Sequence, residues 1–177
     1  SGIVYRESET DPWMDGSAWN DDYPAAQQIL DMDVHDDQVF GVGSNISGPL
    51  QVYLPPTADD MLFTPVELTD GVIEYVELWD VDADEDGLVV GGCDQNDDVG
   101  LIFSIGTEWA SSGYSLDGWT RFDVRTLLGE GFTWVRGVCR GDGLIVAVGE
   151  ASSISGFVMT SEDGGVSFTD RTSEILA

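Results

Sequence analysis

Lysine is absent from this chain. Its six arginines face 34 acidic residues, which gives a formal net charge of −28 over 177 residues. Such an acidic surface repels phosphate backbones and anionic lipid headgroups, so we expect no nucleic acid as a partner and no membrane insertion. Cations and basic proteins are the complementary ligands. Because salt screens repulsion between like charges, the balance also favours a saline environment.

Long apolar segments are missing as well. No run approaches the roughly 18 residues that a membrane-spanning helix needs, and no charged-then-apolar leader opens the sequence. Strand-like residues begin at once with Ser1-Gly2-Ile3-Val4. We therefore expect a mature or excised piece of a protein that works in an extracellular, periplasmic or cell-surface location.

Sulfur and imidazole are scarce. The two cysteines, Cys93 and Cys139, permit one disulfide, and the sequence leaves open whether they are bridged or free. The only histidine, His35, lies among aspartates in a predicted turn, so a catalytic triad is excluded. Cys-x-x-Cys pairs, phosphate loops and dinucleotide fingerprints are also absent. The sequence offers no catalytic residues, and we expect no enzyme activity from this chain alone.

What is present is a repeat. Residues 29–43, 78–93 and 134–149 each contain an alternating segment, a short polar turn and a compact apolar run that ends in a small residue. The ends of these runs, Gly43, Cys93 and Gly149, are 93 − 43 = 50 and 149 − 93 = 56 residues apart. The pattern predicts three β-hairpins, with turns at 35–38, 84–87 and 140–143.

Each hairpin is followed by a third short apolar run and then a fourth, at 61–63, 119–122 and 166–169, and residues 17–19 are expected to be the fourth strand of a half blade. Four strands per repeat at this period are typical of a β-propeller blade. We therefore predict an all-β fold of four-stranded antiparallel blades, about three and a half of them, in a single propeller unit or part of one. The expected segments are a half blade at 1–23 and blades at 24–70, 71–127 and 128–177. Helix is expected only as single turns near 24–30 and 125–129.

Residues 161–168, Ser-Glu-Asp-Gly-Gly-Val-Ser-Phe, resemble the Asp-box of sialidase-like (BNR-repeat) β-propellers. The resemblance implies a turn between the third and fourth strands of a blade. In such a turn Asp163 caps backbone amides, Gly165 takes a conformation that other residues resist, and Phe168 anchors the hairpin. Ser161 and Ser167 complete the motif. Sialidases hold their substrate with three arginines, and the arginines here have other neighbours, so the resemblance implies fold and not activity.

The sharpest acidic motif is Asp82-Ala83-Asp84-Glu85-Asp86-Gly87. It matches the Asp-x-Asp-x-Asp-Gly core of calcium loops, in which alternating carboxylates surround a hard cation. The twelfth position, where a helix-loop-helix site needs glutamate, is Cys93. Asp82, Asp84 and Asp86 are therefore candidate calcium ligands, and a solvated hairpin tip is the alternative interpretation.

Two functional classes remain. The first is a non-catalytic binding or scaffold propeller for a protein, glycan or cation, with Trp109 as a candidate ligand contact. The alternative is a fragment of a glycan-active, sialidase- or glycosidase-like enzyme whose catalytic residues lie outside this chain. Because three and a half blades do not close a ring, we expect further blades as partners, from the same parent protein or from another copy. The ligand, the oligomeric state and the blade number stay open.

Overall fold

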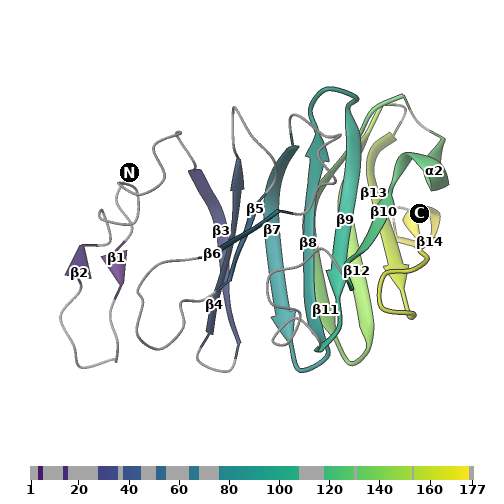
Figure 1. The fold of residues 1–177 in the computed structure, drawn as a ribbon. Coiled ribbons are helices and arrows are strands. Elements are labelled where there is room, and N and C mark those ends of the chain that lie inside the picture. The colour runs from purple at the N-terminus through teal and green to yellow at the C-terminus, as the bar shows by residue number, and fades with distance from the viewer. Residues whose placement is uncertain are drawn as a thin grey trace.

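The computed structural model describes residues 4–5, 14–15, 28–35, 38–44, 51–54, 64–67, 76–107, 118–129, 131–152 and 154–175. Within these residues the chain forms antiparallel β-sheets and two single-turn helices, α2 (Arg125–Leu128) and α3 (Thr172–Ile175) (Figure 1). The expected all-β class is confirmed, and the turn expected near 125–129 is α2. No helix of the described part is long and apolar enough to cross a membrane.

Three runs of four consecutive antiparallel strands make up most of the fold. The first unit is β3 (Gln28–His35), β4 (Gln38–Ser44), β5 (Gln51–Leu54) and β6 (Thr64–Glu67). The second is β7 (Val76–Asp84), β8 (Gly87–Asp94), β9 (Val99–Ile105) and β10 (Thr120–Asp123). The third is β11 (Thr133–Gly141), β12 (Leu144–Ala151), β13 (Ile154–Ser161) and β14 (Thr169–Asp170). A short pair, β1 (Val4–Tyr5) and β2 (Met14–Asp15), precedes them.

The first strand of each unit, β3, β7 or β11, is called its leading strand below. Each leading strand carries one extra residue in its pairing with the next strand, between Ile29 and Asp31, between Leu78 and Asp80, and between Val135 and Gly137. Because the extra residue lies at the corresponding place in each leading strand, the three units can be aligned residue by residue. Asp31, Asp80 and Gly137 are therefore equivalent positions.

The predicted hairpins are present, and in the first unit His35 pairs with Gln38 as the predicted turn at 35–38 requires. In the third unit Gly141 pairs with Leu144, so the turn lies one residue later than predicted, and Asp142 and Gly143 both have positive φ, 53° and 74°. Two positive φ angles are the mark of a type I′ turn. In the second unit Asp84 pairs with Gly87, which places Glu85 and Asp86 at the tip.

The hydrophobic core lies between consecutive units. Phe40 and Val42 of the first unit pack with Leu78, Val81 and other buried residues of the second. A second cluster joins Val89, Ile102 and Val124 of the second unit to residues of the third, including Val135, Ile145, Ala147, Phe157 and Met159. Strands β8 and β9 are buried along their whole length because they contact a neighbouring unit on both faces.

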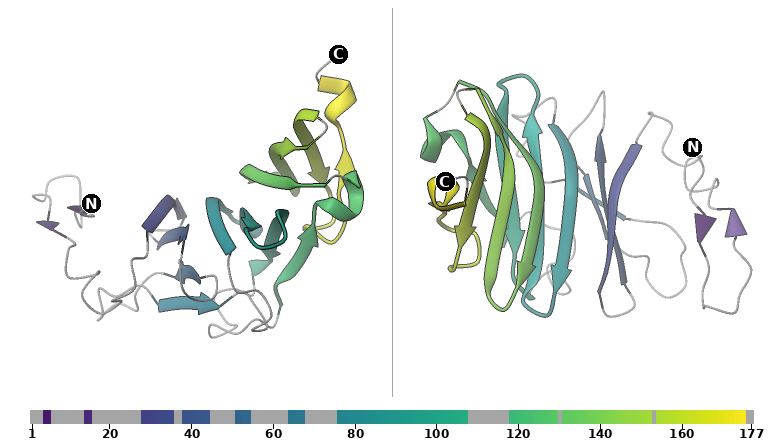
Figure 2. Two further views of the ribbon diagram at one scale, coloured as in Figure 1. Left: turned by 90° about the horizontal axis from the view of Figure 1, so that it is seen from above. Right: turned by 180° about the vertical axis from the view of Figure 1, so that it is seen from behind.

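The units follow one another along an open arc, which Figure 2 shows from above. The first two are joined at one residue pair, Ser44 with Glu77, so that β3 to β10 form one eight-stranded sheet. No closed sheet is formed by the described residues.

One local prediction is wrong, and others fall on residues that the structure does not describe. The fourth strand of the first unit was expected at 61–63, which lie outside the described residues, and the described strand β6 begins at Thr64. The helical turn expected at 24–30 is wrong for residues 28–30, which belong to β3. Residues 24–27, like the half-blade strand expected at 17–19, lie outside the described residues.

Candidate functional site

Aspartates on the leading strands connect one unit to the next. On β3, Asp31 Oδ2 accepts a hydrogen bond from the backbone amide of Val81 at 3.1 Å, and Asp33 Oδ2 accepts one from Ala83 at 2.8 Å. On β7, Asp80 Oδ2 accepts from Val138 at 2.6 Å, and Asp82 Oδ2 accepts from the amide of Arg140. We call these four carboxylates and their amide partners the carboxylate ladder.

The ladder repeats with the unit. Asp31 and Asp80 are equivalent in register, as are Asp33 and Asp82, and their amide donors are equivalent as well. In each pair of strands the earlier aspartate accepts from the earlier amide and the later aspartate from the later one. Neighbouring leading strands therefore run parallel. In the third unit the two acceptor positions hold Gly137 and Cys139. The ladder therefore ends at β11.

Asp80 has an unusual electrostatic setting within the ladder. Burial, followed by a hydrogen bond with Asp31 and the negative charges of Asp31 and Asp82, raises the pKa of its carboxyl to about 6, against the lowering effect of the Val138 amide. Near neutral pH this carboxyl therefore holds a proton for part of the time. In its neutral form it can donate to Asp31 while it still accepts from Val138.

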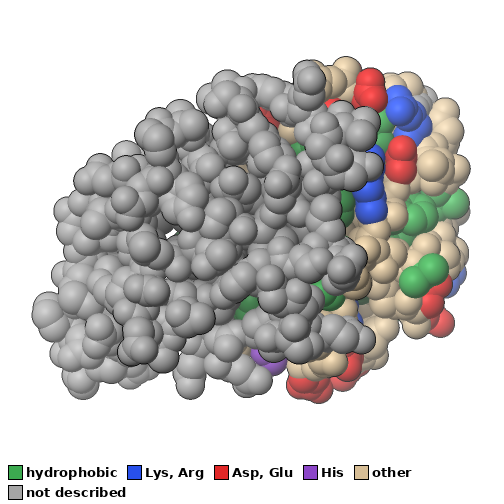
Figure 3. Space-filling model, viewed as in Figure 1, with side chains coloured by type: hydrophobic (Ala, Val, Ile, Leu, Met, Phe, Trp, Pro, Cys, Tyr) green, Lys and Arg blue, Asp and Glu red, His purple; other side chains and the backbone are tan. Residues whose placement is uncertain are grey.

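The residues of the predicted calcium loop are engaged with the third unit. Asp84 Oδ1 accepts from the amides of Asp86 and Gly87 and from Nε of Arg140, the last at 2.9 Å. Nη2 of Arg140 donates to the carbonyl oxygen of Asp86 at 2.6 Å, and Asp82 takes the backbone amide of Arg140. The guanidinium supplies positive charge where a calcium ion was predicted. In the view of Figure 3, acidic side chains are visible at the lower edge of the described part of the molecule.

Arginine also lies between aromatic rings farther along the leading strands. The guanidinium carbon of Arg136 lies 4.1 Å from the ring centre of Trp79 and 4.7 Å from that of Trp134. The two indoles meet edge to face at 6.0 Å, and Arg136 forms an ion pair with Glu150. Trp79 and Trp134 are both half-buried. Sequence reasoning missed the cluster because Trp79 and Arg136 belong to different units, and their equivalence appears only once the extra residues of β7 and β11 are aligned.

The turn at 161–168 is held by its own side chains. Asp163 accepts from the amide and the hydroxyl of Ser167, at 2.9 and 2.6 Å, and Ser161 Oγ accepts from the amide of Gly165. Hydrogen bonds from Ser167 and Ser161 hold the pKa of Asp163 at about 2. Gly165 has φ +93°, and Phe168 is buried against Phe122 with ring centres 4.7 Å apart.

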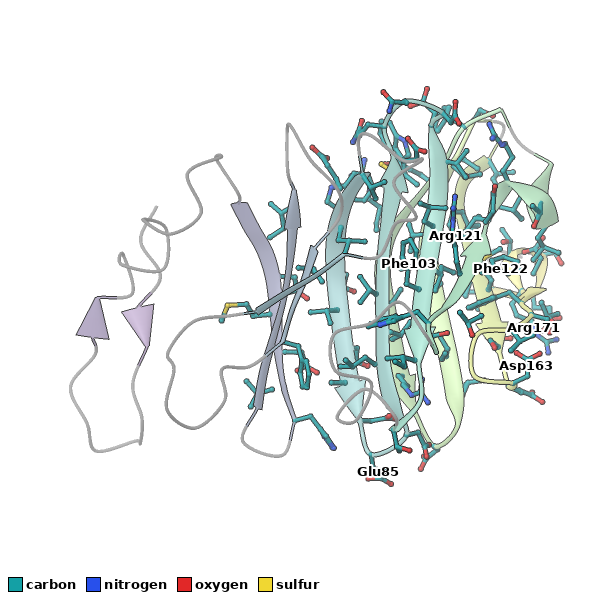
Figure 4. The ribbon with its side chains drawn as sticks, viewed as in Figure 1. Glu85, Phe103, Arg121, Phe122, Asp163 and Arg171 are labelled. Atoms are coloured by element: carbon teal, nitrogen blue, oxygen red, sulfur yellow. The ribbon has the colours of Figure 1, made fainter. Side chains whose placement is uncertain are left out.

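This turn also contacts the second unit, since Ser104 Oγ donates to the carbonyl oxygen of Gly164 at 2.7 Å. Figure 4 shows Asp163 at the far edge of the third unit, well away from Glu85 at the tip of the β7–β8 hairpin. The fold therefore does not bring the turn and the predicted calcium loop together.

The remaining candidates are Trp109 and the two cysteines. Trp109 lies outside the described residues. Cys93 and Cys139 are free thiols, the first buried and the second exposed, so the disulfide that the sequence left open is not formed. Burial, first among several causes, raises the pKa of the Cys93 thiol to about 12. Among the residues that the structure describes, no three His, Cys, Asp or Glu side chains are grouped so that they could hold a metal ion.

Comparison of the chain with protein-family models, with curated proteins and with solved structures gives no match. The ladder, the aromatic cluster and the turn at 161–168 are therefore the features that bear on function.

Proposed function

We propose that this chain is a non-catalytic binding or scaffold module built from β-propeller blades. The observation that carries the proposal is the carboxylate ladder, because it assigns acidic side chains of two successive leading strands to the same structural task. Four-stranded antiparallel meanders that pack face to face along an arc are the arrangement expected of consecutive blades. The hydrogen-bonded turn at 161–168 supports the Asp-box resemblance in the same way.

The way the carboxylates are used supports a non-catalytic role. A general acid or nucleophile has to reach a substrate. The ladder aspartates instead accept backbone amides of the neighbouring unit, and Asp84 pairs with Arg140. Neither geometry leaves two carboxylates facing each other across an open site, as glycoside hydrolysis requires.

The net charge of −28 favours a basic protein, a glycan with few charges or a cation as ligand, in an extracellular, periplasmic or cell-surface setting. The cluster of Trp79, Trp134 and Arg136 offers a stacking surface for a sugar or a peptide, and Arg136 remains partly exposed.

The test is a parallel screen of the purified chain against a glycan array, a set of small basic proteins and a panel of glycoside substrates. We expect saturable binding in one of the first two, weakened by Trp79→Ala, and no turnover of any glycoside. Turnover that is lost on substitution of one carboxylate would instead establish the alternative, a glycan-active enzyme.

Calcium at Asp82, Asp84 and Asp86 stays a prediction. Thermal unfolding in CaCl₂ is compared with NaCl of equal ionic strength for the wild type and Asp84→Ala. A specific site raises the midpoint in calcium only for the wild type. Equal shifts in both proteins indicate charge screening and remove calcium from the account.

A further inference from the structure

The two interfaces between units are built alike. In each, the leading strand of the later unit buries apolar side chains against the earlier unit and donates two backbone amides to its aspartates. Val81 of β7 is 4% exposed and Val138 of β11 is 8% exposed. Their amides are the ones that Asp31 and Asp80 accept.

Strand β3 has the same later-unit features, and among the described residues no four-stranded unit precedes it. Its equivalent of Val81 and Val138 is Met32, which is 44% exposed, and its equivalent of Ala83 is Val34, which is 61% exposed. Leu30, at the extra residue of β3, is 43% exposed. Met32 and Val34, two residues apart on one face of β3, form an exposed apolar pair, called the β3 row below. No carboxylate of the described residues accepts from the amides of Met32 and Val34.

We propose that the β3 row is a docking surface for a β-strand that runs parallel to β3 and carries two aspartates in an Asp-x-Asp pair. The strand covers Met32 and Val34, and its two carboxylates accept their backbone amides, as Asp31 and Asp33 do for β7. The proposal deepens the scaffold function and rests on it in one respect, namely that the units extend by repeated packing.

The ladder also argues against the third unit of a second copy as the partner that covers the β3 row. Such a copy would present β11, where Gly137 and Cys139 replace the aspartates. It would cover the apolar row but leave the two amides without acceptors, and an unpaired buried amide costs about 1–3 kcal/mol. A strand with the Asp-x-Asp pair satisfies both needs.

The probe is a labelled peptide with the sequence of residues 76–94, the β7–β8 hairpin, in which Cys93→Ser prevents disulfide formation. Its affinity for the full chain is measured by fluorescence anisotropy in about 0.5 M NaCl, which screens the repulsion between two acidic partners. The matched peptide carries Asp80→Ala and Asp82→Ala. On the chain, Val34→Asp places a charge in the β3 row, and Val166→Asp makes the same change at a valine that is 67% exposed outside it.

We expect saturable binding of the Asp-x-Asp peptide and affinity about tenfold weaker for the alanine peptide. Val34→Asp should weaken binding at least as much, and Val166→Asp should bind as the wild type does. If Val34→Asp fails to fold, Met32→Asp replaces it, and the peptide pair tests the ladder without changing the chain. No saturable binding, equal affinities for the two peptides, or unaffected binding by Val34→Asp overturns the proposal.

Sedimentation of the chain alone distinguishes the other occupant. Self-association that Val34→Asp abolishes and Val166→Asp preserves would make a second copy the occupant and would overturn the choice of an Asp-x-Asp strand. The two proposals also fail separately. Turnover in the glycoside screen would overturn the non-catalytic function, and it would leave the peptide result standing.

Discussion

Asp80 shows how a single residue carries both structure and pH dependence. Its carboxyl accepts the Val138 amide and hydrogen-bonds with Asp31, and burial keeps its pKa at about 6 against a usual value of 3.8. Between these two values the folded state binds more protons than the unfolded state. The stability that Asp80 contributes is therefore complete below pH 3.8 and is lost as the pH rises through about 6.

The first prediction concerns Asp80→Asn. Asparagine keeps an oxygen for the Val138 amide and cannot ionise, so the variant should be more stable than the wild type at pH 8 by about 1 kcal/mol, a figure reduced because the group is only half-buried. The advantage should vanish near pH 4. Denaturant unfolding at both pH values measures it.

Glu162→Gln is the control, because it removes one charge from an exposed residue outside the ladder. If it stabilises the chain at pH 8 as much as Asp80→Asn does, reduced net charge explains the effect and the ladder does not.

Two adjacent glycines in the turn at 161–168 provide the second prediction. Both have positive φ, but a Cβ at Gly165 would overlap Ser104 Oγ, whereas a Cβ at Gly164 meets nothing within 4 Å. Gly164→Ala should cost about 1–2 kcal/mol, from the left-handed backbone alone. Gly165→Ala adds the overlap and should cost about 2–4 kcal/mol. Thermal unfolding compares them, and equal losses would mean that the contact with the second unit contributes nothing.

At the scale of the element, the leading hairpins were predictable because their signals are local. Alternating apolar residues and short polar turns place β7, β8, β11 and β12 to within a few residues. The fourth strands were less predictable. Strands β6 and β14 are short and each pairs with only one neighbour, so their sequences need not be strongly apolar.

The third prediction concerns the packing of β8 against β11. A Cβ at Gly91 would lie 2.7 Å from Cγ1 of both Val135 and Val138, so Gly91→Ala should destabilise the chain by about 1–3 kcal/mol. Gly141→Ala is the matched change, since a Cβ there meets nothing within 4 Å, and we expect a change within about 0.5 kcal/mol. Chemical denaturation measures both. A neutral Gly91→Ala would contradict close packing between the second and third units.

Gly91 lies where the second unit packs against the third, since a Cβ there would meet Val135 and Val138. A Cβ at Gly92 or Gly149 would instead meet the backbone of the leading strand in its own unit, at Glu77 or Trp134. The sequence pattern is the same in both cases. The two kinds of glycine are distinguished only by their pairing with the leading strand, which depends on where its extra residue lies.

For the whole molecule, composition predicted an acidic all-β chain but not what its acids do. With 34 carboxylates, no pair is singled out by type alone. The signal was present in the repeat, because Asp31 and Asp33 recur as Asp80 and Asp82 at the same position of consecutive units. This signal can be recognised only when the leading strands are known to lie side by side, because the residues in contact are 50 positions apart in the sequence.

The central claim is that successive units are joined by aspartate-to-amide hydrogen bonds between their leading strands. Its most direct test is amide hydrogen exchange, followed by NMR, in the wild type and in the double variant Asp31→Ala/Asp33→Ala. We predict that Val81 and Ala83 lose protection in the variant while Val138 and Arg140 keep theirs, since Asp80 and Asp82 remain. Unchanged protection at Val81 and Ala83 in a folded variant would contradict the ladder.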